Sequence, residues 1–336
     1  MILATNMKPP EIKIIPQETE DYKYDFKNIK GQIQARKASE IAAAGMHNML
    51  MMGSPGVGKS IIAKTMPSIL PDMTLEEQIE ISKIQSVAGN LSGSLVKTRP
   101  VRSPHHTATV SAMIGGGFNP KPGEITQAHG GILFLDELPE FSRQVIETLR
   151  QPLEDEKIIV SRSGGTYEFP AKFILIGAMN PCKCGYYPDM NKCTCTEQEV
   201  KKYMEKISGP LIDRIDLCVH MNQVTYFQLE KEEQPEDSLT IKERVNRAVQ
   251  IQRERYANEK FKFNSQLSGE NIKKYCKLNK EEQHLMEKIY TTMDLSIRAY
   301  DKIIKVARTI ADLKQHEKIQ QGDIAEAVSY RPVLFK

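Results

Sequence analysis

One glycine-rich segment of the chain has a spacing that suits phosphate binding. Residues 53–60 read Gly-Ser-Pro-Gly-Val-Gly-Lys-Ser and match the pattern G-x-x-x-x-G-K-[ST]. Glycines let such a loop turn its backbone N–H groups toward phosphate oxygens, and a following helix adds positive potential at its N-terminus. The pattern predicts that Lys59 reaches the β- and γ-phosphates of a nucleotide and that the Ser60 hydroxyl holds Mg²⁺. The predicted phosphate-binding residues are Gly53, Ser54, Pro55, Gly56, Val57, Gly58, Lys59 and Ser60.

Two carboxylates follow an apolar run further along the chain. Residues 132–135 are Ile-Leu-Phe-Leu, and Asp136 and Glu137 come next. Ligands of an open α/β sheet bind at the carboxyl ends of its strands. Asp136 there would hold Mg²⁺, and Glu137 would orient the attacking water or accept its proton. The alternative is that these two acids merely open the next helix, where acidic residues are favoured. The upstream phosphate motif favours the catalytic interpretation.

Asn180 ends a third apolar segment, Phe173–Met179. Its amide would hydrogen-bond a γ-phosphate or the attacking water if the segment is a strand of the same sheet. Asn also favours turns, and Pro181 follows it. Position alone leaves both interpretations open.

The elements that must position these residues alternate between strand and helix. We expect a helix over Gln32–Ala44 that stops at Gly45, a strand over Asn48–Met52, and a helix from Lys59 to about Met66. This alternation predicts an α/β core with a parallel sheet. The later periodic segments, 241–257, 269–277, 280–292, 296–314 and 322–329, predict helices. The expected organisation is an extended lead-in at 1–28, the core at 29–229, a linker at 230–240 and a helical domain at 241–336.

Composition is that of an ordinary globular protein of about two domains. Of 336 residues, 40% are hydrophobic and 26% are charged, and the net charge of +3 neither requires nor excludes nucleic acid. No apolar run approaches the roughly 20 residues of a membrane helix, and Met1–Pro10 lacks the apolar core of a signal peptide. We therefore expect a cytoplasmic protein that has no membrane partner.

Four of the six cysteines form two close pairs. Cys182 and Cys184 precede Cys193 and Cys195 by a short loop. Four thiolates can close a tetrahedral Zn²⁺ site that orders such a loop. The C-x-C spacing is tighter than the usual C-x₂₋₄-C, and reduced thiols or a redox pair are the alternatives. We favour structural zinc.

Several longer strings support a family resemblance. They are Arg102-Ser-Pro-His-His-Thr107, Gly123-Glu-Ile-Thr-Gln-Ala-His-Gly130, Leu135-Asp-Glu-Leu-Pro-Glu-Phe141, Ser208-Gly-Pro-Leu-Ile-Asp-Arg-Ile-Asp216 and Val306-Ala-Arg-Thr-Ile-Ala-Asp-Leu313. From about residue 22 onward, the chain resembles AAA+ ATPases of the magnesium-chelatase-like competence protein family (ComM or YifB type). Members usually carry an additional N-terminal domain resembling the Lon protease domain. This chain starts just before the ATPase module, so we expect a fragment or a short member.

The resemblance implies a P-loop AAA+ three-layer core followed by an all-α lid, with ATP and Mg²⁺ as cofactors. It makes the phosphate motif Walker A, Asp136 and Glu137 Walker B, and Asn180 sensor 1. Arg214 matches the arginine finger that reaches the γ-phosphate of a neighbouring subunit, and Arg298 matches the sensor 2 arginine. The alternative for Arg214 is a surface arginine paired with a nearby acid. The alternative for Arg298 is an ordinary helix arginine. Family members form hexameric rings, so the resemblance predicts a homo-oligomer whose active site is split between subunits.

Two insertions are candidates for contact with DNA. Part of Pro100–Gly123 is expected, by the resemblance, to point into the ring pore. Residues 157–170 have strand-like runs around Ser-Gly-Gly and predict a β-hairpin with Arg162 near its tip. A basic tip could grip single-stranded or branched DNA, and a solvated loop is the alternative. His105 and His106 lack an acidic or cysteine partner at ligand spacing, which disfavours a metal there.

The favoured function is an ATP-driven motor on DNA, a helicase or branch-migration enzyme in recombination or natural transformation whose ATP hydrolysis DNA stimulates. This is what the resemblance implies. The alternative is a magnesium-chelatase-type ATPase subunit that drives metal insertion into a porphyrin. A third interpretation, a nucleotide-gated assembly platform, conflicts with the intact set of catalytic residues.

Overall fold

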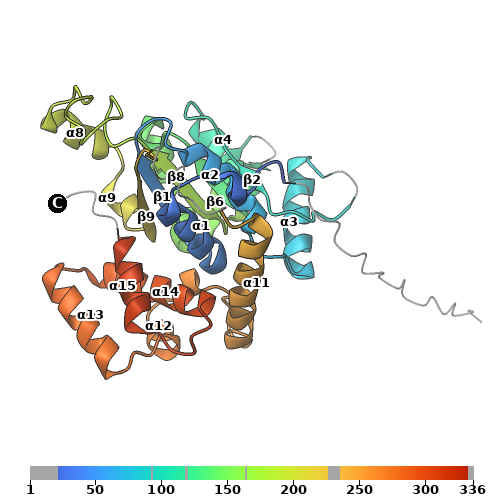
Figure 1. Ribbon diagram of the computed structural model, residues 1–336. Coiled ribbons are helices and arrows are strands. Elements are labelled where there is room, and N and C mark those ends of the chain that lie inside the picture. Colours follow the sequence, from blue (N-terminus) through green and yellow to red (C-terminus); the bar gives the residue numbers. More distant parts are fainter. Residues whose placement is uncertain (1–21, 92–93, 118–119, 163–164, 226–234, 332–336) are drawn as a thin grey trace, which may run out of the picture.

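The computed structural model describes residues 22–91, 94–117, 120–162, 165–225 and 235–331. An α/β core is followed by a group of helices at the C-terminal end of the chain (Figure 1). Most of the predicted extended lead-in lies outside the described residues. Its last part forms a 3-10 helix, η1 (Phe26–Asn28), which buries the Phe26 ring completely.

The core is built on a five-stranded parallel sheet in the order β2-β5-β8-β1-β9. The strands are β1 (Met49–Gly53), β2 (Val101–Arg102), β5 (Ile132–Leu135), β8 (Ile174–Met179) and β9 (Leu217–Met221). The three strands predicted from the sequence are present, to within one residue at each end. Strands β2 and β9 were not predicted, because β2 has two residues and β9 is a five-residue run whose fourth residue is the polar His220.

Apolar side chains on alternate strand positions face opposite sides of the sheet. Met49 and Met51 pack with α1 (Ile33–Gly45) and α2 (Lys59–Thr65), whereas Leu50 and Met52 belong to the core on the other face. The helices that contribute to that second core are α4 (Val110–Ile114), α5 (Glu124–Gln127), α6 (Arg143–Thr148), α7 (Arg150–Asp155), α8 (Glu197–Met204) and α9 (Gly209–Ile212). The parallel α/β core with helices on both faces is therefore confirmed.

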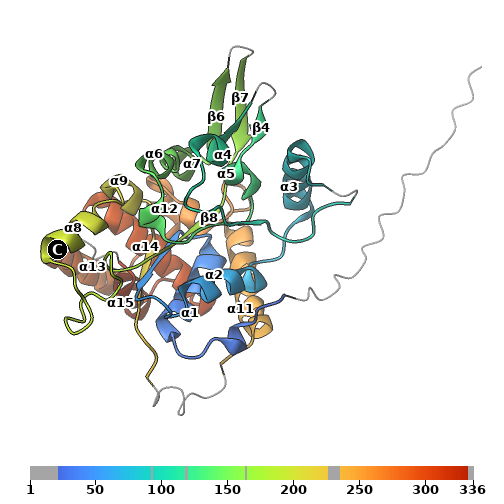
Figure 2. The same cartoon turned by 90° about the horizontal axis from the view of Figure 1, so that it is seen from above.

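Two antiparallel hairpins extend this core. Strands β3 (Gly115–Gly116) and β4 (Lys121–Pro122) form the shorter one, near α3 (Leu75–Ala88). The predicted hairpin is present as β6 (Lys157–Arg162) and β7 (Gly165–Pro170), in which Arg162 pairs with Gly165. It stands out from the body of the molecule in Figure 2.

The C-terminal region is helical, as predicted. It contains α11 (Ser238–Arg255), α12 (Glu270–Tyr275), α13 (Lys280–Thr292), α14 (Ile297–Leu313) and α15 (Gln321–Ser329). Helix α11 begins inside the predicted linker, because the Asp237 carboxylate accepts a hydrogen bond from the Thr240 backbone N–H, at 2.8 Å, and caps the helix. The described residues hold no helix with the length and apolarity that crossing a bilayer requires.

Gly45 does not end α1 in the way predicted. The helix includes Gly45, and Met46 takes the left-handed conformation at the C-cap, with φ of 56°. A Cβ at Gly45 would lie 2.3 Å from the Nε2 atom of His47 and 2.6 Å from the hydroxyl of Thr309. The glycine is required because α14 approaches closely, and the helix stop falls one residue later.

Candidate functional site

The glycine-rich loop connects β1 to α2 at the carboxyl edge of the sheet. Gly56 and Gly58 have φ values of +81° and +100°, where side chains with a Cβ are disfavoured. Gly53 has another role, since a Cβ there would lie 2.4 Å from the Met221 carbonyl oxygen on the neighbouring strand. Helix α2 begins at Lys59, so its N-terminus directs backbone N–H groups toward the loop. This geometry suits a bound phosphate chain.

Lys59 is held at the mouth of this loop by oxygen acceptors. Its ammonium donates to the Gly53 carbonyl at 2.6 Å, the Ser54 carbonyl at 3.0 Å and the Asn180 side-chain oxygen at 3.0 Å. Burial lowers the pKa of Lys59 below its usual range, and the carboxylates of Asp136 and Glu137 oppose that shift. Asn180 and the P-loop lysine, 121 positions apart, therefore meet at one site.

The two acids lie at the carboxyl end of β5, beside the loop. The Ser60 hydroxyl donates to the Asp136 carboxylate at 2.7 Å, so the two predicted Mg²⁺ ligands are adjacent. An alcohol and a carboxylate are oxygen donors of the kind that Mg²⁺ prefers. Glu137 follows in a left-handed conformation, with φ of 52°, and its carboxylate is 57% exposed. Ser60 and Asp136 could therefore hold the ion, and Glu137 is open to an incoming water.

His106 is a residue near the candidate site that the sequence did not assign to it. Its Nδ1 lies 3.5 Å from the Glu137 carboxylate, and its ring meets the Phe141 ring edge-on. The sequence suggests His106 only as a metal ligand, and it shows no acidic partner at ligand spacing. The acidic partner comes from a distant strand end, and no local spacing signals that contact.

Arg214 and Arg298 are not brought to the P-loop of their own chain. The Arg214 carbonyl accepts a hydrogen bond, 3.0 Å long, from the side chain of Asn48, which immediately precedes β1. The P-loop follows the opposite end of that five-residue strand, roughly 16 Å away. The Arg214 guanidinium contacts Glu154 and the Pro210 carbonyl, and that of Arg298 lies 3.9 Å from Asp213.

These two arginines line a cleft of about 710 Å³ between the core and α14. Its walls include acidic and basic side chains in similar numbers, among them Glu154, Asp213, Lys302 and Lys305. Among its described lining residues there is none from 53–60. One chain therefore carries a phosphate loop at one edge of its sheet and a cleft with two arginines at the other.

The four clustered cysteines lie in the loop after β8. The Sγ atom of Cys182 is 3.3 Å from that of Cys184 and 3.8 Å from that of Cys193, and the four sulfur atoms lie within 4.8 Å of one another. A tetrahedron with Zn–S bonds of about 2.3 Å has edges of about 3.8 Å, so this donor set fits Zn²⁺. A Cβ at Gly185, in the same loop, would lie 2.6 Å from Pro55, so the loop packs against the P-loop.

We expect the purified protein to carry about one Zn²⁺ per chain. Cys184→Ser should release it and lower the thermal stability, because a four-thiolate site orders an irregular loop. Cys276→Ala is the matched control, since this buried cysteine follows the last residue of α12, lies outside the cluster and should leave the metal in place. Metal analysis with thiol titration is the measurement. Metal-free protein with four reactive thiols would contradict the zinc site.

Comparison with known proteins supplies the family. The model described as "Magnesium chelatase, subunit ChlI" matches residues 25–229, and "Magnesium chelatase, subunit ChlI C-terminal" matches residues 235–331. "Competence protein ComM" of Haemophilus influenzae is 42% identical over 312 residues, which are 92% of this chain and 60% of that protein. "Uncharacterized protein YifB" of Escherichia coli is 41% identical over 92% of this chain and 61% of its own length.

A more distant relative is named as a magnesium-chelatase subunit. The "Magnesium-chelatase 38 kDa subunit" of Chlorobaculum parvum is 26% identical over 184 residues, which cover 47% of this chain and 53% of that protein. The chain spans about three fifths of the length of the two more similar relatives.

Proposed function

Because this chain belongs to the magnesium chelatase ChlI family, we propose that it is an AAA+ ATPase that acts as a motor on DNA in recombination or natural transformation. The ATPase proposal rests on two hydrogen bonds at the carboxyl edge of the sheet. Lys59 bonds to Asn180, and Ser60 bonds to Asp136. These contacts support a single site in which a phosphate-binding lysine, a pair of candidate metal ligands and an amide lie together.

Each residue of this site has a proposed task in hydrolysis. Lys59 and the backbone N–H groups of the loop would bind the β- and γ-phosphates, and Ser60 and Asp136 would hold Mg²⁺, which neutralises the developing phosphate charge. Glu137 would orient the attacking water and accept its proton. Asn180 would hydrogen-bond the γ-phosphate or the water.

We propose that the site is complete only between two copies of the chain. A neighbour's Arg214 would reach the γ-phosphate as an arginine finger, and assembly into a ring would bring that arginine to the nucleotide. Arg298 shares the cleft with Arg214, which supports a role for both arginines toward the neighbour's nucleotide. The family resemblance suggests a hexameric ring as the assembly.

The choice of DNA over a porphyrin as the substrate of the motor rests first on sequence similarity to the two kinds of relative. The ComM relative matches 92% of this chain, whereas the chelatase subunit is 26% identical over 47% of it. The β6–β7 hairpin is a second support, because it projects from the body and exposes Tyr167, an aromatic ring on which a base can stack. A chelatase-type subunit remains the alternative function.

The test measures ATP turnover in the presence of Mg²⁺ with no further addition, with single-stranded DNA, with forked DNA, and with a porphyrin. We expect DNA to raise turnover and Lys59→Ala to abolish it under every condition. Tyr167→Ala should weaken DNA binding by about 10-fold, since stacking of one base contributes ~1–3 kcal/mol. Tyr290→Ala is the matched control, because Tyr290 is 40% exposed on α13 and Tyr167 is 39% exposed. Turnover that responds to porphyrin and not to DNA would favour the alternative.

A further inference from the structure

The backbone that carries Arg214 is held by a lysine from α14. The Lys302 ammonium donates to the Ile215 carbonyl at 2.8 Å and lies 3.4 Å from the Ile212 carbonyl. These two carbonyls bracket Asp213 and Arg214 in the sequence. Lys302 therefore closes the turn between α9 and β9 at which the arginine is presented.

Lys302 occupies this position at an electrostatic cost. Burial lowers its pKa to about 8, although the carboxylates of Asp216 and Asp213 favour its charged form and the cations of Lys305 and Arg214 oppose it. A lysine used only for solubility would extend into water instead. Its stem and ammonium are turned inward to reach backbone oxygens of a neighbouring element.

The same turn is fixed on its other side by the residues before β1. The Asn48 side chain donates to the Arg214 carbonyl, and the Asn48 backbone N–H donates to the Asp216 carboxylate, each at 3.0 Å. His47 lies 3.5 Å from that carboxylate through Nδ1, and its Nε2 is 2.7 Å from the Thr309 hydroxyl on α14. The turn thus lies between the sheet edge and α14 and contacts both.

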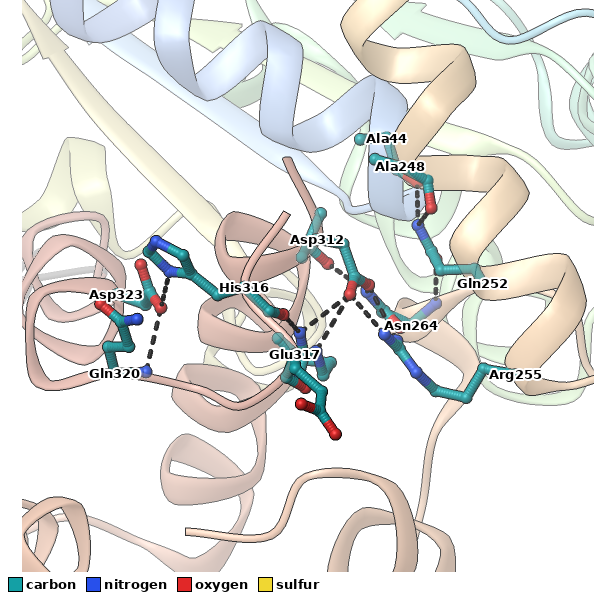
Figure 3. Close-up of polar contacts among 12 residues, drawn as sticks. Ala44, Ala248, Gln252, Arg255, Asn264, Asp312, His316, Glu317, Gln320 and Asp323 are labelled. Atoms are coloured by element: carbon teal, nitrogen blue, oxygen red, sulfur yellow. Dashed lines mark hydrogen bonds and ion pairs between the residues drawn. The ribbon is translucent and has the colours of Figure 1, made fainter. Parts of the chain in front are cut away.

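Helix α14 is itself anchored by a buried polar network, shown in Figure 3. The Asp312 carboxylate accepts hydrogen bonds from Arg255 of α11, at 2.5 and 2.9 Å, and from Asn264 at 2.8 Å. The Gln252 side chain joins the Asn264 backbone to the Ala44 carbonyl of α1. Satisfied buried networks rigidify the elements that they join. Lys302 therefore projects from a helix whose position relative to the core is fixed.

We propose that Lys302 is a positioning residue for Arg214, which fixes the turn that presents the arginine to a neighbouring subunit. The inference rests on the proposed function, because it assumes that Arg214 acts on the neighbour's nucleotide. Lys302 would act through the turn, because its ammonium is bonded to the backbone carbonyls of Ile212 and Ile215. Its loss would shift the guanidinium, and a misplacement of about 1 Å at a reacting centre can lower a rate about 100-fold.

The test replaces the ammonium and keeps the stem, in Lys302→Met. We expect the kcat for ATP to fall by about 10–100-fold while the KM and the nucleotide affinity of the isolated chain stay unchanged. Lys288→Met is the matched control, since Lys288 is exposed on α13, and it should behave as wild type. A kcat for Lys302→Met equal to that of the control would overturn the inference.

Mixed assemblies separate a misplaced arginine from a destabilised protein. A Lys59→Ala subunit has no working P-loop but presents an intact Arg214, so adding it to Lys302→Met should restore part of the turnover. Arg214→Ala mixed with Lys59→Ala is the reference. If ATP turnover recovers in neither mixture, the proposal that the active site is shared between two subunits fails. If ATP turnover recovers only when Arg214→Ala is mixed with Lys59→Ala, the proposed function stands and the role of Lys302 is refuted.

Discussion

Replacing Glu137 with glutamine should slow ATP hydrolysis by about 10²–10⁴-fold and leave ATP binding intact. Glutamine has nearly the shape of glutamate but cannot accept the proton of the attacking water. The binding groups are elsewhere: Lys59 contacts Asn180 and the loop carbonyls, and Ser60 contacts Asp136. Steady-state turnover and the dissociation constant of a fluorescent ATP analogue are the two measurements.

Glu140→Gln is the matched control for this change. Glu140 lies three residues away, in η3 (Leu138–Glu140), and is partly exposed, with Lys206 at 3.4 Å as its ion-pair partner. Exposed pairs of this kind contribute about 0–1 kcal/mol, so turnover should remain near that of the wild type. Equal losses in the two variants, or a loss of ATP affinity in Glu137→Gln, would contradict the assignment of Glu137 as the general base.

The parts of the fold that local sequence determines were predictable. Strands β1, β5 and β8 are uninterrupted apolar runs, and the P-loop is one contiguous motif whose glycines have a known conformational purpose. Strand β9 was missed because a polar histidine interrupts a short run that pairs along a distant partner, β1. Gly45 was misread because its neighbour Thr309 belongs to α14, far along the chain.

The contacts that complete the candidate site could not be predicted, for the same reason. Glu154 meets Arg214 across 60 positions, and Lys302 meets Ile215 across 87. Neither pair has a spacing that a helix or strand period would reveal. The position of His106 beside Glu137 depends likewise on how the segment after β2 packs against the segment after β5. Sequence patterns predicted the candidate catalytic groups, whereas tertiary packing decides which residues hold those groups in place.

Replacing Arg214 with alanine should lower turnover in the assembled protein by about 10³–10⁵-fold, the contribution expected of an arginine finger. The affinity of the isolated chain for ATP should not change, because the Arg214 backbone lies at the amino end of β1 and the P-loop follows the other end. Arg214→Lys should also lose most activity, since an ammonium cannot reproduce the planar guanidinium fork. Turnover and ATP affinity are measured on the same preparations.

The proposed role would require Arg214 to leave a contact that it makes within its own chain. Its guanidinium contacts the Glu154 carboxylate, which is 60% exposed, so a phosphate presented by a neighbour would have to replace that acid. Arg150→Ala is the matched control, because Arg150 lies on α7, the helix that carries Glu154, and has a partly exposed ion pair with Glu147. An Arg214→Ala variant that hydrolyses ATP as fast as Arg150→Ala, or that binds ATP more weakly as a single chain, would exclude a role toward the neighbour. Loss of turnover at unchanged affinity, recovered by adding Lys59→Ala subunits, is the result that only a site shared between two chains can give.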